Sequence, residues 1–200
     1  CIFYYDELFQ GPVSFTIQHV TEFLAEHLDR LLFVREIRQR VALHAHCDHP
    51  RRRQEARAAA TLLAAVPGLD YVKIASDPRL GRACSLFTQQ ALGMEAWKQR
   101  ITRQLQEASA AGAETLATLY HGCQRLLCIY EERYPLTIEH YLSLFARALG
   151  IEHEDTYKTY RLWRDPERVL AAMTPCMQAN QVRADEARQV VERTFPAEEA

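Results

Sequence analysis

Three cysteines recur at nearly equal intervals: Cys84 follows Cys47 after 37 positions, and Cys123 follows after a further 39. Cysteine thiolates bind zinc and iron–sulfur clusters. The other cysteines of the 200-residue chain are Cys1, Cys128 and Cys176. No secretion signal is visible, and cysteines scattered through a chain of this size are more typical of reduced thiols or metal ligands than of a disulfide framework. We therefore expect a reducing cytoplasm and a metal held by Cys47, Cys84 and Cys123.

Short apolar runs that alternate with helical patterns are expected to position these cysteines. Strands are predicted at residues 41–46, 71–74 and 116–120, and amphipathic helices lie between them. Such alternation indicates an α/β fold of βαβ units, with a parallel sheet and helices packed on it. Each of the three cysteines follows one predicted strand. Because the carboxyl ends of parallel strands lie along one edge, the three thiols are expected to converge.

The surroundings of Cys123 favour chemistry most clearly. Residues 121–123 are predicted to turn from the strand into a helix that begins at Gln124. The amino end of a helix favours a thiolate. Gly122 lies in this turn, and close approach of the backbone or a positive φ would exclude a side chain there. A cysteine hydrolase that uses Cys123 and His121 is a further alternative.

Composition excludes several functions. The chain has 24 basic and 26 acidic residues and a formal net charge of −2, which does not favour nucleic acid as a partner. The basic run at residues 51–53 fits the solvated first turn of a helix. No apolar run is long enough to insert into a membrane. Neither a glycine-rich phosphate loop nor a catalytic pair of carboxylates is visible. The chain begins at Cys1 without methionine, which we interpret as a piece of a longer protein.

Two segments resemble each other. Residues 16–25 and 137–146 share Thr, Ile, His and Ala in register, and Cys1 precedes the first as Cys123 precedes the second. We interpret them as a duplication, with one helix from about Ile17 to Glu36, capped by Ser14 or Thr16, and another from about Ile138. Beyond Gly150, Asp165 is expected to cap a new helix. We expect these last residues to wrap over the core rather than present an aromatic docking face, and Cys176 to be inert.

The motifs at the cysteines resemble the cysteine-rich CCG domain found in heterodisulfide reductase. Iron–sulfur subunits of glycolate oxidase and glycerol-3-phosphate dehydrogenase carry similar domains. The resemblance covers roughly Cys1 to Gly150 and rests on residues 44–47, 83–85 and 120–123. Ala83, Ser85 and Tyr120 depart from the family pattern and reduce its five ligands to three. Together with the repeat, the resemblance implies residues 1–40 as the tail of an upstream repeat, 41–150 as a CCG-like cluster-binding domain and 151–200 as a helical extension.

The resemblance implies an iron–sulfur electron-transfer subunit or an oxidoreductase subunit of the disulfide-reductase type. Three thiolates can hold a [4Fe–4S] cluster, with the fourth iron open or bound by another residue. Flavin or iron–sulfur proteins are the expected partners. The alternative is a degenerate scaffold subunit that is metal-free or binds zinc through three cysteines and a histidine. The residues within sequence reach of the fourth position are Cys128, His121, His44, His46 and His49.

Overall fold

A four-stranded, all-parallel sheet forms the centre of the chain, which we describe from a computed structural model covering residues 11, 13–44, 50–74 and 86–197. The strands are β1 (Arg40–His44), β2 (Asp70–Val72), β3 (Thr115–Thr118) and β4 (Thr137–His140), in the order β2-β1-β3-β4. Ala42 of β1 pairs with Val72 on one side and with Leu116 on the other. The predicted α/β fold with a parallel sheet is confirmed.

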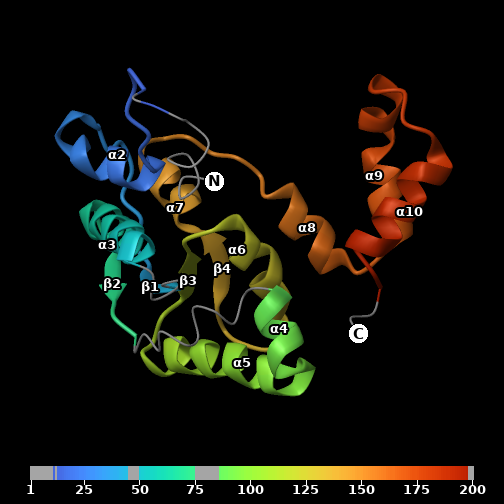
Figure 1. The fold of residues 1–200 in the computed structure, drawn as a ribbon, viewed down its shortest axis with the longest axis horizontal. Helices are drawn as coiled ribbons and strands as arrows, with labels where there is room; N and C mark the ends of the chain where they lie inside the picture. Colours follow the sequence, from blue (N-terminus) through green and yellow to red (C-terminus); the bar gives the residue numbers. More distant parts are fainter. Residues whose placement is uncertain (1–10, 12, 45–49, 75–85, 198–200) are drawn as a thin grey trace.

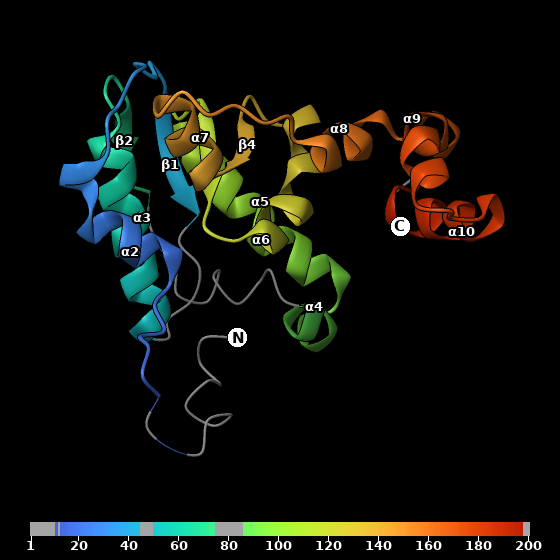
Figure 2. The same ribbon diagram turned by 90° about the horizontal axis from the view of Figure 1, so that it is seen from above.

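Helices cover both faces of the sheet (Figures 1 and 2). On one face, α3 (Pro50–Ala65) and α7 (Tyr141–Ala148) share an apolar cluster with Val41 and Leu43. On the other face, α5 (Met94–Ala110) packs on Ala42. Successive side chains of a strand point to opposite faces, so strands covered on both sides read as continuous apolar runs. The helices α6 (His121–Leu127) and η4 (Cys128–Glu132) connect β3 to β4 on the α5 side, and α4 (Leu86–Leu92) precedes α5.

Two predicted helices are wrong in part. The segment from Ile138 begins with strand β4, and α7 starts only at Tyr141. The segment predicted as one helix from Ile17 to Glu36 contains only α2 (Val20–Glu26) and the 3₁₀ turn η2 (Leu28–Arg30). Its later apolar residues pack on the core although the backbone there is not helical. Phe33, for example, packs edge-on against Phe145 at 5.6 Å between ring centroids. Of the apolar positions that suggested the helix, Leu24, Leu28 and Leu31 pack against the core, whereas Val20 and Phe23 are 47% and 49% exposed.

The two similar segments share a histidine cap. His19 Nδ1 accepts a hydrogen bond from the Thr21 amide, and His140 Nδ1 accepts one from the Leu142 amide, both at 3.3 Å. The expected caps at Ser14 and Thr16 are therefore wrong. The segments differ otherwise: residues 137–140 form β4 while residues 16–19 form no strand, and α2 packs mainly against α3. Cys1 lies outside the described residues, and the duplication remains a prediction.

The last part of the chain consists of α8 (Thr156–Trp163), α9 (Pro166–Ala179) and α10 (Ala184–Thr194). As expected, Asp165 caps α9 by accepting a hydrogen bond from the Arg168 amide at 3.0 Å. α9 and α10 do not wrap the core, because they extend away from the sheet (Figures 1 and 2) and pack on α8 in a separate apolar cluster. The aromatic residues of α8 are partly buried and pack in this cluster. No helix within the described ranges is long and apolar enough to cross a membrane.

Candidate functional site

The strand order places a topological switch point at the carboxyl ends of β1 and β3. After β1 the chain turns to α3 on one face of the sheet, and after β3 it turns to α6 on the other face. In open α/β sheets, ligands bind at such a switch point, outside the carboxyl ends of the strands. The strands that precede Cys47, Cys84 and Cys123 are β1, β2 and β3, which are neighbours in the sheet. Cys47 and Cys84 lie outside the described residues.

Cys123 lies in the first turn of α6 and is 2% exposed. A nucleophilic thiol must reach its substrate, so this burial argues against the cysteine hydrolase. Burial is compatible with a metal ligand. Within the described ranges, no group of three or more His, Cys, Asp or Glu side chains is arranged to hold a metal ion. Convergence of the three thiols thus remains a prediction.

The expectation for Gly122 is wrong. Helix α6 begins at His121, so Gly122 lies within its first turn rather than in a special turn before it. A Cβ atom built on Gly122 meets nothing within 4 Å, and its φ is not in the left-handed region. Gly112, before β3, is the demanding position, with a φ of +71° and the Arg40 guanidinium 3.0 Å from its would-be Cβ.

Buried polar side chains gather at the carboxyl ends of β1 and β3. His44 ends β1, is buried, and makes a hydrogen bond through Nδ1 to Gln104 Oε1 of α5. An amide oxygen only accepts, so this bond fixes the proton on Nδ1 and leaves the lone pair on Nε2. That tautomer is the one in which imidazole binds a metal while its other nitrogen is held by the protein. The Tyr120 hydroxyl donates to the carboxylate of buried Glu55.

Cys128 is a poor ligand. Its thiol donates to the Arg125 carbonyl at 3.6 Å, and burial raises its pKa to about 11. The thiol is therefore protonated near neutral pH, whereas metals bind the thiolate. Of the fourth-ligand candidates within the described ranges, His44 and His121 remain, while His46 and His49 lie outside those ranges.

His140 is a structural residue. Its Nε2 donates to the Leu119 carbonyl at 3.1 Å, and its Nδ1 caps α7. The ring stacks on His121 with 4.0 Å between centroids and 12° between planes. Burial, and then the charge of His121, lowers its pKa to about 4. His140 is therefore neutral at pH 7, and with both nitrogens engaged it joins the end of β3 to the start of α7.

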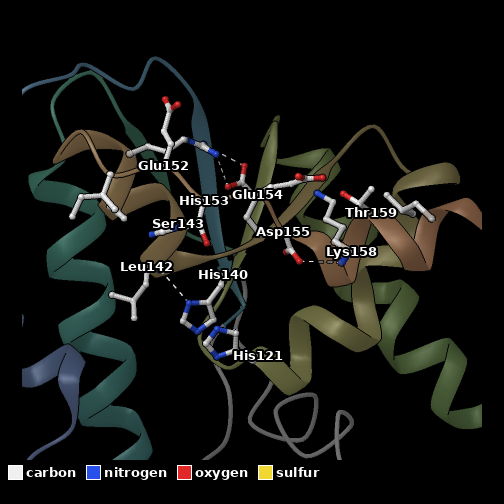
Figure 3. A pocket seen from close by; sticks show the side chains of 15 residues that line it. His121, His140, Leu142, Ser143, Glu152, His153, Glu154, Asp155, Lys158 and Thr159 are labelled. Atoms are coloured by element: carbon white, nitrogen blue, oxygen red, sulfur yellow. Dashed lines mark hydrogen bonds and ion pairs between the residues drawn. The ribbon is translucent and has the colours of Figure 1, made fainter. Parts of the chain in front are cut away.

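The stacked histidines form one end of a cleft of about 710 Å³ between α7, residues 151–155 and α8 (Figure 3). Arg147 and Glu139 form an ion pair of 2.7 Å in its wall, and Gln124 donates to the Asp155 carboxylate. The lining carries both signs of charge. The sequence analysis missed this cleft, although the polar run at residues 152–155, after Gly150, was a signal for it.

The fold defines a three-layer α/β protein in which helices cover both faces of an all-parallel sheet. Compared with known proteins, the chain matches no family model, no curated protein and no solved structure.

Proposed function

We propose that the protein binds an iron–sulfur cluster at the carboxyl edge of its sheet and serves as an electron-transfer or disulfide-reductase subunit. The observation that carries this proposal is the strand order. Cys47, Cys84 and Cys123 each follow one of three adjacent parallel strands. Chain segments that leave neighbouring strand ends begin about 5 Å apart, which supports convergence of the three thiols at one edge of the sheet. A bound cluster supplies one-electron chemistry.

The chain's own residues fit this role. Cys123 lies buried in the first turn of α6, where bulk water has little access to its thiol. His44 lies three residues before Cys47 at the carboxyl end of β1, and Gln104 orients its ring through Nδ1, which makes it our candidate for the fourth position. The cleft of about 710 Å³ beside His121 gives a partner thiol or disulfide a place to bind. A reducing cytoplasm and a redox partner protein belong to the same proposal.

Iron and acid-labile sulfide in protein purified without oxygen from iron-replete cells test this proposal. We expect both, together with broad visible absorption. Replacing Cys47, Cys84 or Cys123 with serine should remove most of the iron, while Cys176→Ser, at an exposed position, should retain it. Circular dichroism checks that each variant folds.

The alternatives give different results. If the protein is colourless and holds one tightly bound zinc that is lost when the same cysteines are replaced, the site binds zinc rather than a cluster. Protein that lacks metal after purification, and also after anaerobic supply of iron and sulfide, would overturn the proposal and leave a scaffold. His44→Gln tests the fourth position: iron should remain, and the electron paramagnetic resonance spectrum of the reduced protein should change. An unchanged spectrum would exclude His44.

A further inference from the structure

A second cavity, of about 300 Å³, lies where the C-terminal helices meet α5 and η4. Its cationic lining residues come from distant parts of the chain. Within the described residues, five cations line it and no acidic residue does: Lys98, Arg133, Arg161, Arg164 and Arg193. The chain as a whole carries a net charge of −2, so this concentration of positive charge is local.

Two of the five cations are held in place by the protein. Arg164 makes an ion pair of 2.6 Å with Glu132, and Arg161 Nη1 donates to the Thr194 carbonyl at 2.7 Å. Lys98, Arg133 and Arg193 make no ion pair with any residue of the described chain. Several other arginines of the described chain, by contrast, are paired with a carboxylate, as Arg147 is with Glu139 at 2.7 Å. Like charges around one cavity repel one another, and an anion inside it removes that cost.

The remaining lining determines the kind of anion. Apolar surface comes from Leu126, Ile129 and Pro196 and from the mostly buried rings of Trp97 and Tyr130. Guanidinium groups match the geometry of phosphate oxygens and bind them in pairs of hydrogen bonds. A volume near 300 Å³ is at the small end of the range for ligand pockets. A space of this size fits a compact molecule better than the backbone of a nucleic acid, which needs an extended groove.

We propose that this cavity binds a small organic phosphate, of about the size of a nucleoside monophosphate, with its phosphate on the arginines and its body on the apolar wall. Because the cavity is lined from both α5 and α10, the bound anion would join the C-terminal helices to the rest of the protein. The proposal is independent of the metal site.

Isothermal titration of the full chain with adenosine monophosphate tests the proposal, with adenosine and pyrophosphate as further probes. We expect one monophosphate per chain, no binding of adenosine, and weaker binding at high salt because the contacts are ionic. The double variant Arg133→Ser/Arg193→Ser should weaken binding by about tenfold or more. The matched control, Arg30→Ser/Arg53→Ser, changes the net charge equally at exposed positions away from the cavity and should bind as the wild type does.

Several results would overturn the proposal. Equal weakening in the double variant and its control would show that only net charge matters. Binding of neither phosphate compound at millimolar concentration would exclude a phosphate site, and binding of pyrophosphate alone would exclude the apolar wall from the site. Saturable binding of an acidic peptide or an oligonucleotide, with no binding of the monophosphate, would replace the small ligand by a macromolecule. Circular dichroism of the variants excludes misfolding, which is not expected because Arg133 and Arg193 are exposed.

Discussion

Removing the lysine that covers the outer edge of β4 should destabilise the protein more than removing any exposed arginine. Lys158 Nζ lies 2.5 Å from Glu131 Oε1 and donates to the Ile138 carbonyl at 3.1 Å. The same Glu131 oxygen accepts a hydrogen bond from the Ile138 amide at 2.5 Å. The two side chains thus take the place of a fifth strand for the amide and the carbonyl of Ile138.

The magnitude follows from burial. The side chains of Lys158 and Glu131 are only 16% and 18% exposed. Lys158→Met keeps most of the buried alkyl chain. It leaves the Glu131 carboxylate without its counter-ion and the Ile138 carbonyl without its side-chain donor. Such losses cost about 2–3 kcal/mol. In a chain of this length that corresponds to a fall of about 4–12 °C in melting temperature.

Denaturant unfolding of Lys158→Met, Glu131→Gln and the double variant measures the coupling between the two residues. We expect a coupling free energy of about 1 kcal/mol or more. The control is Arg183→Met, which breaks an ion pair with Asp185 whose side chains are 67% and 65% exposed, and should change stability by less than about 0.5 kcal/mol. Equal effects of Lys158→Met and Arg183→Met would refute the reasoning.

Three further outcomes follow from single residues. The pKa of His140 is about 4 in the folded protein against 6.5 for an ordinary histidine, so the unfolded chain alone binds a proton between these values. The free energy of unfolding should therefore fall by about 3 kcal/mol as pH falls from 6.5 to 4, and His140→Asn, which can still cap α7, should lose this part of the pH dependence in denaturant titrations. Gly112→Ala should cost about 1 kcal/mol because of its positive φ, while Gly122→Ala should be neutral or stabilising by up to about 1 kcal/mol because it lies in a helix with open space around it. With a thiol reagent at pH 8, exposed Cys176 should react at once, whereas buried Cys128, with a pKa of about 11, should react mainly on unfolding, as mass spectrometry of the labelled peptides would show.

A specific result would contradict each of these three predictions. His153→Asn, at an exposed position, is the control for the pH dependence of stability. If both variants lost the same part of this pH dependence, the effect could not be assigned to His140. Greater damage from Gly122→Ala than from Gly112→Ala would restore a special role for Gly122. Equal labelling rates for the two cysteines would contradict the burial of Cys128.

The sequence predicted those strands whose signal is local. β1 and β3 are buried on both faces, so their apolar runs were visible. β4 was missed because Thr137–His140 contains a single apolar residue, and Ile138 also fits the helical spacing of Tyr141 and Phe145. Its conformation depends on pairing with β3, which lies some twenty residues earlier in the chain.

The candidate site was predictable only in part. Alternating strands and helices indicated that the cysteines follow successive parallel strands, and the sheet order agrees with that arrangement. The role of His140 depends on the Leu119 carbonyl and on a stacked neighbour, neither of which sequence spacing reveals. Both cavities are lined by side chains from several elements, so their shape and charge arise only when those elements pack together.

The separate cluster of the C-terminal helices has a consequence for slow motions of the protein. The buried apolar residues of this part of the described chain are Val169, Ala187, Val191 and Phe195, a small number for a unit of three helices. Pro175 within α9 also removes one backbone donor from that helix. Helices that rest on so few buried residues open at lower free energy than a sheet covered on both faces. Amide hydrogens of α9 and α10 should therefore exchange with solvent through local unfolding, while those of β1 and β3 exchange only when the whole sheet unfolds.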